Sequence, residues 1–558
     1  AGEERVAWLT GFTGSAARLV VLPETAALFT DGRYTLQVQA EVDTARFETP
    51  HLIHEPPATW LRAHAPDGLR LGYDPFLHLR GELDRLEKAL AVRGGELIPL
   101  TPNPIDRLWR QRPAPPAAPM VAHPLAHAGE SSADKRRRML EAVAEAGAEG
   151  LFVSAADGVA WLLNIRGGDV PFNPLCLGLA LVLPEARAVL LTDPAKQPAG
   201  FAFEDGEIAL HPLDERRALY AELAREGTRI LADPAVTHAG LIDELTTAGV
   251  CVVEGKDPVT GAKAKKNNAE VAGARRAQVV DGAAVSRFLA RLDRGDCADE
   301  LAAAAALETE RAKAPDYLGP SFDTISGAGP NGAIVHYRVT EASNRPLEPG
   351  TLYLVDSGGQ YPDATTDITR TVAIGEPAAE MRRRFTLVLK GHIALAEAVF
   401  PEGTAGSQID ALARRPLWAA GLDYDHGTGH GVGSRLCVHE GPQRIAKRGG
   451  DVKLEAGMIL SNEPGNYPPG AYGIRIENLM LVVERGMPAG GDLALLGFEV
   501  LTMAPIDRRL VEPELMTAEE LAWLDAYHAR VRARLAPELD EADRAWLEAA
   551  TAPLGRAA

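Results

Sequence analysis

The most informative segment of the chain reads Leu352-Tyr-Leu-Val-Asp-Ser-Gly-Gly-Gln-Tyr-Pro-Asp-Ala-Thr-Thr-Asp-Ile-Thr-Arg370. Its first residues form an apolar run that predicts a β-strand ending at Asp356. The Gly358-Gly359 and Pro362-Asp363 pairs mark turns, after which a second strand is expected to carry Asp367. We therefore expect two antiparallel strands that bring both carboxylates to one point.

Two further segments combine glycine-rich turns with residue types that bind metals. One reads His426-Gly-Thr-Gly-His430-Gly-Val-Gly433 and is followed by His439-Glu440. The other reads Ser461-Asn-Glu463-Pro-Gly-Asn-Tyr-Pro-Pro-Gly-Ala-Tyr-Gly-Ile-Arg475-Ile-Glu477-Asn478, where a Gly/Pro-rich turn separates two strand-like runs that each carry a glutamate. The glycines beside His430 predict a close approach of the backbone to metal and substrate, because glycine has no Cβ.

Together the three segments supply four carboxylates and one imidazole as candidate metal ligands: Asp356, Asp367, His430, Glu463 and Glu477. Carboxylates bridge paired cations, and this ligand set suits hard-to-borderline divalent ions such as Mn²⁺ better than a thiolate zinc site does. Each residue alone could equally be a turn, cap or core residue. The glycine-rich run matches neither a P-loop nor a dinucleotide fingerprint. Because all three segments occur together, we predict a two-metal centre.

Length and composition exclude several classes of protein. The 558 residues suffice for several domains, and 46% hydrophobic with 24% charged residues is ordinary globular composition. The net charge of −19 argues against binding to nucleic acid or to an anionic membrane, because both need a basic surface. Only four, widely spaced cysteines occur, which predicts a reducing, cytoplasmic environment. Neither a membrane span nor a signal peptide is expected.

The N-terminal half contains a faint internal repeat. Ala7-Trp8-Leu9 recurs at 160–162, Val21-Leu22-Pro23-Glu24 at 182–185, and Thr30-Asp31 at 192–193, in the same order. In each copy two apolar runs flank the Pro-Glu pair, a pattern that predicts a β-hairpin. We prefer two related α/β domains to coincidence in an Ala- and Leu-rich chain, and we predict that the Pro-rich stretch 112–119 links them.

Helical patterns dominate the region between the repeat and the metal-binding segments. Helices are expected over 134–146, from the basic cluster at 263–268 to about residue 292, and over 298–312. A third domain is expected to begin at the second of these helices. From Ser321 onward the chain becomes glycine-rich and strand-like.

These motifs resemble the signature of the creatinase/methionine-aminopeptidase, or pita-bread, metallopeptidases, and most closely that of the three-domain Xaa-Pro aminopeptidases (aminopeptidase P). The resemblance covers nearly the whole chain and includes Gly11-Phe-Thr-Gly-Ser-Ala16, Phe29-Thr-Asp-Gly-Arg33-Tyr34, Trp161-Leu-Leu-Asn-Ile-Arg166, Lys266-Asn-Asn-Ala-Glu270 and the stretch 496–528. It implies an α/β (α+β) fold with two creatinase-N-like domains, a pita-bread catalytic domain and a C-terminal extension. The expected boundaries are 1–112, 118–264, 265–495 and 496–558. The strand and helix that usually precede Gly11 are not recognisable, so we expect either a first domain truncated at its start or a family member with a shortened first domain.

The resemblance also implies a role for each metal ligand. Asp356 would bind one metal alone, His430 and Glu463 the other, while Asp367 and Glu477 would bridge both. The attacking water or hydroxide would bridge the metals, and Glu463 would accept its proton. Arg475 precedes Glu477 by two residues; on a shared strand it would face the same side and orient that glutamate or carry charge near the site.

Further residues match substrate-binding or proton-transfer positions of the family. Catalytic roles are expected for His336, His426, His439 and Glu463. Substrate contacts are expected from Arg33, His336, His426, His430, His439 and Arg475. His426 and Val432 are candidates for lining a pocket that selects proline by shape, since proline has no amide N–H and its ring fixes φ.

The implied activity is release of the N-terminal residue from peptides with proline at the second position. Two divalent ions, Mn²⁺ or alternatively Zn²⁺ or Co²⁺, are the expected cofactors, peptides the expected partners, and a homodimer the expected assembly. One alternative is a prolidase, which shares the motifs but is limited to dipeptides. The other is a metal-free peptide-binding module, which the intact ligand set disfavours. Methionine aminopeptidases and creatinases are shorter chains.

Overall fold

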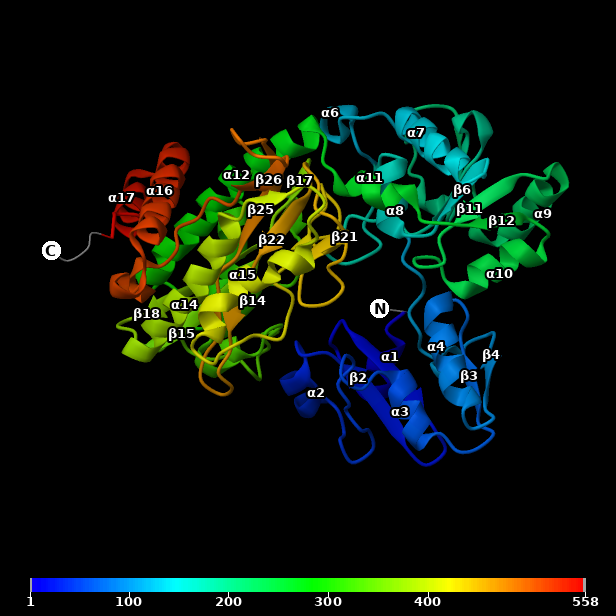
Figure 1. Ribbon diagram of the computed structural model, residues 1–558, viewed down its shortest axis with the longest axis horizontal. Coiled ribbons are helices and arrows are strands. Elements are labelled where there is room, and N and C mark those ends of the chain that lie inside the picture. The colour runs from blue at the N-terminus through cyan, green and yellow to red at the C-terminus, as the bar shows by residue number, and fades with distance from the viewer. Residues whose placement is uncertain (1–2, 555–558) are drawn as a thin grey trace. The chain divides into compact units, whose positions relative to one another are not determined.

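The computed structural model describes residues 3–554, which form two compact units (Figure 1). The first unit comprises the chain up to Leu125 together with 130–170 and 175–261. The second comprises 126–129, 171–174 and the chain from Ala262 onward. Helix α6 (Leu125–Ala128) and helix α11 (Pro258–Ala264) lie at the points where the chain passes between units. Within the described residues no helix combines the length and apolar character needed to cross a bilayer.

The first part of the first unit holds two small two-stranded sheets with helices beside them. Its elements are α1 (Arg5–Thr10), β1 (Ala17–Val21), β2 (Ala26–Thr30), α2 (Thr35–Glu41), α3 (Pro57–His64), β3 (Arg70–Tyr73), α4 (Arg80–Ala91), β4 (Glu96–Pro99) and α5 (Pro104–Leu108). Strands β1 and β2 pair antiparallel around Pro23-Glu24, so the first predicted hairpin is confirmed. Helix α1 ends at Gly11, whose φ of 81° lies in the left-handed region. The expectation that no helix precedes Gly11 was therefore wrong.

The second part of the first unit is built on a six-stranded mixed sheet of order β10-β9-β8-β6-β11-β12. Its elements are β5 (Val121–Ala122), α7 (Ser132–Glu145), β6 (Gly150–Val153), α8 (Ala156–Leu162), β7 (Ile165–Arg166), β8 (Leu179–Val182), η1 (Pro184–Ala186), β9 (Ala188–Leu191), η2 (Pro194–Lys196), β10 (Ile208–His211), η3 (Leu213–Glu215), α9 (Arg216–Glu226), β11 (Arg229–Ala232), α10 (Ala239–Thr247) and β12 (Cys251–Glu254). Strands β8 and β9 form the second predicted hairpin. The predicted helix over 134–146 is α7, and residues 113–120 have no regular structure, as a linker requires.

The second unit combines long helices with several sheets (Figure 1). Its elements up to the fourth helix are α12 (Asn268–Asp293), α13 (Glu300–Arg311), β13 (Gly319–Pro320), β14 (Ile325–Ala328), η4 (Gly329–Ala333), β15 (Thr351–Ser357), β16 (Gly359–Tyr361), β17 (Ala364–Thr365), β18 (Ile368–Ile374), α14 (Ala379–Ala396), β19 (Phe400–Pro401) and α15 (Gly406–Trp418). The remaining elements are β20 (Gly429–Gly431), β21 (Glu440–Ile445), β22 (Ile459–Asn462), β23 (Gly465–Asn466), β24 (Ile474–Arg475), β25 (Asn478–Gly486), β26 (Leu495–Val500), η5 (Arg508–Leu510), η6 (Pro513–Leu515), α16 (Ala518–Leu535), η7 (Ala536–Glu538) and α17 (Glu541–Ala550).

Two of these helices were predicted from the sequence. Helix α12 begins with a capping box in which the Asn267 side chain accepts from backbone N–H groups and Glu270 bonds back to Asn267. Helix α13 matches the Ala-rich stretch. Two sheets then position the candidate ligands: one of order β14-β15-β18 and one of order β19-β26-β25-β22-β20-β21.

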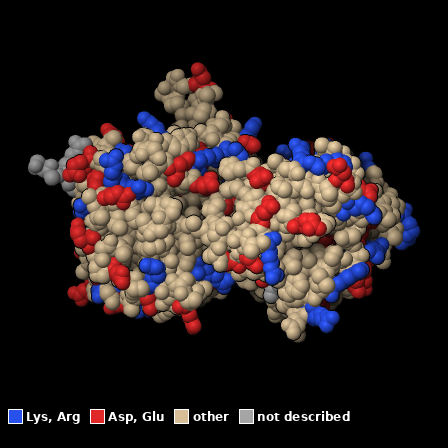
Figure 2. Space-filling model, turned by 90° about the horizontal axis from the view of Figure 1, so that it is seen from below, with Lys and Arg blue, Asp and Glu red and all other residues tan. Residues whose placement is uncertain are grey.

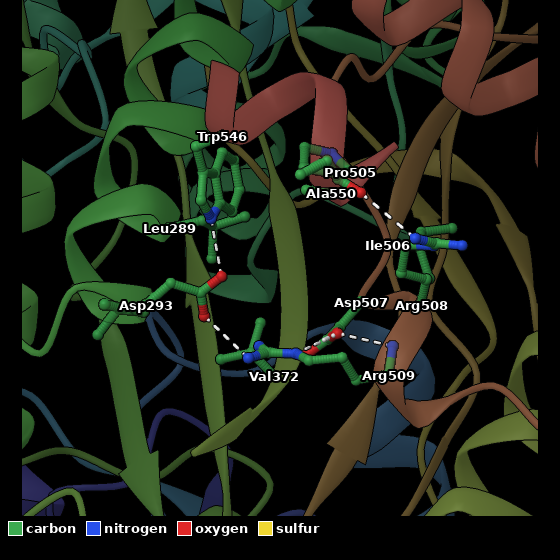
Figure 3. A pocket seen from close by; sticks show the side chains of 12 residues that line it. Leu289, Asp293, Val372, Pro505, Ile506, Asp507, Arg508, Arg509, Trp546 and Ala550 are labelled. Carbon is green, nitrogen blue, oxygen red and sulfur yellow. Dashed lines mark hydrogen bonds and ion pairs between the residues drawn. The ribbon is translucent and has the colours of Figure 1, made fainter. Parts of the chain in front are cut away.

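Helices α16 and α17 of the C-terminal extension pack on α12. Helix α17, α12 and residues 505–509 line a cavity of 240 Å³ (Figure 3). The Trp546 indole N–H donates to Asp293 Oδ2 over 2.7 Å. The Arg509 guanidinium pairs with Asp293 Oδ1 at 3.0 Å. These contacts tie the extension to the end of α12.

Acidic and basic side chains are intermixed on the face of the molecule shown in Figure 2. They do not gather there into the basic stripe that a nucleic-acid-binding surface displays. The exclusion of nucleic acid stays a prediction from net charge.

Candidate metal centre

The candidate ligands lie at the ends of strands that come from distant parts of the sequence. Asp356 lies on β15, which pairs antiparallel with β18 so that Asp356 is opposite Thr369. Asp367 immediately precedes β18, and His430 is the middle residue of β20. Glu463 follows β22, and Glu477 lies between β24 and β25. The predicted antiparallel strands for the two aspartates are confirmed.

The strand ends bring the five side chains into one region. Ligand atoms of Asp367, His430 and Glu477 all lie within 4.8 Å of one another. His430 Nε2 is 3.4 Å from Asp367 Oδ2 and 3.6 Å from Glu463 Oε1. His430 Nδ1 lies 3.0 Å from the Gly431 carbonyl oxygen, so this nitrogen carries the proton and Nε2 is the nitrogen available to a metal.

Burial makes the anionic form of these carboxylates unfavourable without a cation. Desolvation raises the pKa of Asp367 well above its ordinary value, and the charges of Asp356 and Glu463 raise it further. Desolvation likewise raises the pKa of Glu477, with Asp367 and Asp356 as the next causes. Burial also raises the pKa of Glu463, against which the positive charges of His430 and Arg475 act. Divalent cations stabilise the ionised form of carboxylates that lie this close together, because they neutralise the repulsion between them.

One oxygen in the cluster has no protein donor. Asp356 Oδ1 is buried and receives no hydrogen bond from the described residues, whereas its Oδ2 accepts from Arg475 over 2.6 Å. A buried carboxylate oxygen without a donor is costly unless something else satisfies it. The donor set of four carboxylates and one imidazole therefore fits a pair of divalent metal ions.

Arg475 organises the cluster, although not in the predicted way. It lies on β24 while Glu477 lies beyond the end of that strand, so the expectation of a shared strand was wrong. Arg475 Nε donates to Thr369 Oγ1 over 3.0 Å, and the Thr369 hydroxyl donates to Glu477 Oε2 over 2.7 Å. The arginine thus reaches Glu477 through Thr369 and contacts Asp356 directly.

Thr369 and Tyr467 are site residues that sequence reasoning missed. Tyr467 is half-buried beside Arg475, whose Nη1 donates to its hydroxyl over 2.8 Å, and that hydroxyl is 2.9 Å from His426 Nε2. Both residues lie inside the quoted segments, as the Thr of Asp367-Ile-Thr-Arg and the Tyr of Gly-Asn-Tyr467. The bonds of Thr369 to Arg475 and of Tyr467 to His426 join residues 106 and 41 positions apart, so the local sequence contained no signal of them.

The predicted histidines lie at different distances from the ligands. The His439 ring is 4.2 Å from that of His430, edge to face, and its side chain is exposed. His426 Nδ1 lies 3.9 Å from Glu463 Oε2. His336 is half-buried in the loop between η4 and β15. Two of the three histidines are thus placed beside a predicted ligand.

Two predicted substrate contacts do not belong to this cluster. Val432 is 1% exposed and packs in the core with Ile459 and Leu479, so its assignment to a proline pocket was wrong. Arg33 lies in the first unit, where its guanidinium pairs with Asp31 at 2.7 Å. Its role stays a prediction.

The glycines that flank His430 are required, but chiefly by the neighbouring strands. A Cβ on Gly429 would lie 2.1 Å from the Ser461 carbonyl oxygen on β22. A Cβ on Gly431 would lie 2.1 Å from the Glu440 carbonyl oxygen on β21. The close approach expected at these glycines is therefore one of the β20 backbone to the backbones of β22 and β21.

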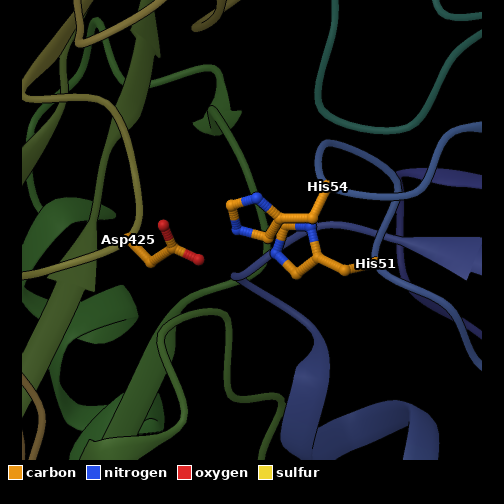
Figure 4. A group of neighbouring side chains, drawn as sticks. All are labelled: His51, His54 and Asp425. Carbon is orange, nitrogen blue, oxygen red and sulfur yellow. The ribbon is translucent and has the colours of Figure 1, made fainter.

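A second pair of histidines lies in the first unit. The His51 and His54 rings are 4.3 Å apart between centroids (Figure 4). His51 Nδ1 accepts from the Ile53 backbone N–H over 3.2 Å, which fixes the turn that carries both residues. Asp425, also drawn in Figure 4, belongs to the second unit.

Comparison with protein families covers almost the whole chain. The creatinase/prolidase N-terminal domain matches residues 1–109 and again 111–270. Metallopeptidase family M24 matches residues 272–484, and the C-terminal region of peptidase M24 matches 494–554. These matches confirm the predicted α/β architecture of two related domains, a pita-bread domain and an extension. They define a metallopeptidase of the creatinase type.

Individual relatives indicate which group of M24 metallopeptidases this chain is most similar to. The chain is 40% identical to a probable Xaa-Pro aminopeptidase P of Fusarium vanettenii, over 98% of this chain and 92% of that protein. Its structure matches that of an X-prolyl aminopeptidase from Caenorhabditis elegans, described as a cytosolic enzyme with a di-nuclear active site. That match has a TM-score of 0.92 and 33% identity, and it covers 99% of this chain and 92% of the other. A Xaa-Pro dipeptidase from Bacillus anthracis matches with a TM-score of 0.53 and 25% identity, covering 68% of this chain and 99% of its own.

The chain belongs to the Xaa-Pro aminopeptidase P family of M24 metallopeptidases. It is therefore a hydrolase, as the motifs predicted. The finer assignments, namely the individual ligand residues and the domain boundaries, stay predictions.

Proposed function

We propose that this chain releases the N-terminal residue from peptides whose second residue is proline. The observation that carries the proposal is the convergence of Asp367, His430 and Glu477 to within 4.8 Å, with Asp356 and Glu463 beside them. A relative named a probable Xaa-Pro aminopeptidase P, at 40% identity, supports it.

The five side chains Asp356, Asp367, His430, Glu463 and Glu477 would hold two divalent metal ions. When bound, such a pair generates a hydroxide nucleophile near neutral pH and polarises the scissile carbonyl. Glu463 would accept a proton from the attacking water, a role that suits a carboxylate whose pKa is raised by burial. The exposed His439, against His430, would donate a hydrogen bond to the developing oxyanion, a role for which His336 is the alternative.

Other residues of the chain would orient the reacting groups. Tyr467 links His426 to Arg475 by hydrogen bonds of 2.9 and 2.8 Å, so His426 is held in one orientation beside Glu463. His430, besides binding metal, would contact the peptide, and Arg475 would contribute positive charge where the peptide binds. Arg33 would contact substrate from the first domain, following the family pattern.

The proposal extends to cofactor, assembly and location. Mn²⁺ is the proposed metal, since oxygen ligands outnumber nitrogen and no cysteine joins the cluster; Zn²⁺ and Co²⁺ are the alternatives. A homodimer and a cytoplasmic location are proposed from the family. None of the four cysteines forms a disulfide within the described residues, which is consistent with a reducing compartment.

The proposal is tested with the purified chain, chelated and then supplied with Mn²⁺, Zn²⁺ or Co²⁺. Release of arginine from Arg-Pro-Pro is expected after metal is restored, with no release from Arg-Ala-Ala. Cleavage of Gly-Pro but not of Arg-Pro-Pro would identify a prolidase instead. Retained peptide affinity without turnover under every metal condition would identify a non-catalytic binding module.

A further inference from the structure

Glu440 is a buried carboxylate that none of the roles above uses. Its Oε1 is 2.6 Å from Lys266 Nζ and its Oε2 is 3.1 Å from Lys263 Nζ. The Glu440 side chain is 0% exposed and both lysine side chains are at most 3% exposed. Lys266 Nζ also donates to the Lys263 carbonyl oxygen over 3.0 Å. Fully buried charges are retained only where they are paired, so this triad is a fixed element of the second unit.

The segment that carries the two lysines also contacts the residues just before strand β22. The Lys266 backbone N–H donates to the Gly457 carbonyl oxygen over 2.9 Å, and Lys265 forms a bridge with Met458, directly before β22. Gly457 has a φ of +92°, and a Cβ there would lie 3.0 Å from the Lys266 carbonyl oxygen. Strand β20 lies between β21 and β22 in the sheet. Residues 263–266 therefore contact β21 through Glu440 and the start of β22 through Gly457, and these two strands flank β20, which carries His430.

Glu440 is also in contact with the glycine-rich motif. It pairs with Gly431 across β20 and β21, at the point where the register shifts after His430. A Cβ on Gly433 would lie 2.9 Å from Glu440 Oε2. The two glycines of His430-Gly-Val-Gly433 thus pack on the backbone and side chain of Glu440.

The same residue fixes its neighbour His439. His439 lies at a bend and directly precedes Glu440, the first residue of β21. Glu440 is buried, while His439 is exposed and its ring centroid lies 4.2 Å from that of His430. A displacement of Glu440 would therefore move both imidazoles.

We infer that Glu440, clamped by Lys263 and Lys266, is a positioning residue that sets His439 relative to His430. It acts through these two histidines and does not itself touch substrate. The inference rests on the proposed function, because it assigns His439 to the reacting carbonyl. It explains why the segment at the start of the catalytic unit carries two buried lysines.

The experiment compares Glu440→Gln with the wild-type chain on Arg-Pro-Pro, measuring kcat, KM and metal content together. Glutamine preserves shape but removes the charge that holds both ammonium groups. We expect kcat to fall about 10- to 100-fold, as for a displacement of reacting groups by about 1 Å. KM should change by less than about 3-fold and both metal equivalents should remain, because the ligand residues are untouched.

Two further variants serve as a milder perturbation of the lysine pair and as a control. Lys263→Met keeps the 2.6 Å pair between Lys266 and Glu440, and should fold with a smaller fall in kcat. Glu455→Gln removes the exposed ion pair with Lys265 in the same segment and should leave kcat unchanged. Circular dichroism and thermal melting report folding for each.

The inference is overturned if folded Glu440→Gln retains full kcat, or if metal and activity fall in the same proportion. Should Glu440→Gln not fold, unchanged kcat in Lys263→Met at full metal content would overturn it instead. Failure of the wild-type chain on Arg-Pro-Pro would reject the proposed function, whereas failure of this inference is visible only in the variants.

Discussion

Arg475 Nη2 donates to Asp356 Oδ2 over 2.6 Å, in a pair whose arginine side chain is 1% exposed. The same guanidinium reaches the hydroxyls of Thr369 and Tyr467. One arginine therefore holds Asp356, a predicted ligand of one metal, directly and, through Thr369, the predicted bridging ligand Glu477. The Arg475 side chain thus places a positive charge beside the carboxylates and also fixes the positions of two predicted ligands.

Thr369→Val should weaken metal binding while the fold persists. Valine fills the same space but leaves Arg475 Nε and Glu477 Oε2 without their shared partner, and each lost bond is buried. Metal affinity should fall about 10-fold or more, as for other partners of ligand residues. Titration of the chelated protein with Mn²⁺ measures it. Thr309→Val, on the exposed side of α13, is the control, and equal affinities in the two variants would contradict the assignment.

His439→Ala should lower turnover far more than metal content. If the imidazole stabilises the oxyanion, kcat should fall about 100-fold. The metal content should stay at the wild-type level, because His439 is not a predicted ligand. Parallel measurement of kcat and of metal by mass spectrometry decides the matter. A proportional loss of both would place His439 in the ligand set instead.

Gly431→Ala should destabilise the chain and reduce activity. The new methyl would lie 2.1 Å from the Glu440 carbonyl oxygen, so β20 and β21 must separate. A clash of this kind costs about 1–3 kcal/mol of unfolding free energy, and it displaces His430. Gly427→Ala in the same motif meets nothing closer than 3.6 Å and is the matched control. Equal melting temperatures for the two variants would contradict this prediction, because they would show that β20 and β21 accommodate the methyl group without loss of stability.

His528 should make the chain sensitive to acid. Burial lowers the pKa of His528 to about 3, with the charge of Arg370 as the next cause, and its Nε2 accepts from the Ile506 N–H over 3.1 Å. The neutral ring is thus required in the folded state, while the unfolded chain takes up the proton from about pH 6.5 downward. Stability from this group is complete above that pH and is lost as the pH falls toward 3.

His528→Gln should remove this part of the acid dependence, because glutamine can accept the same bond and does not titrate. Between pH 7 and pH 5 the wild-type chain should lose about 2 kcal/mol more unfolding free energy than the variant. Urea unfolding at the two pH values measures this. His211→Gln, at a 44% exposed side chain, should behave as wild type. Identical acid dependence in His528→Gln and wild type would contradict the argument.

The local elements were predictable because their signals are contained in short windows. The two Pro-Glu hairpins, the helix α12 with its Asn267 cap, and the paired strands around Asp356 each follow from a few consecutive residues. The glycine-rich turns marked where backbones approach closely. These features depend on local sequence alone.

The errors arose where distant segments meet. Arg475 was placed on one strand with Glu477, but the chain leaves β24 directly after Arg475 and the contact runs through Thr369 on β18. Val432 is buried and packs in the core, which its apolar character alone did not distinguish from a substrate pocket. The lysine clamp on Glu440 spans more than 170 residues of sequence and has no local signal.

The central claim is that five side chains from distant segments hold two metal ions. The most direct measurement is the metal stoichiometry of Asp356→Ala against wild type after equal loading with Mn²⁺, with the exposed Asp323→Ala as the control. Two equivalents are expected in wild type and in the control, and fewer than two in Asp356→Ala, together with loss of activity and an unchanged circular dichroism spectrum. Two equivalents retained in Asp356→Ala would contradict the account.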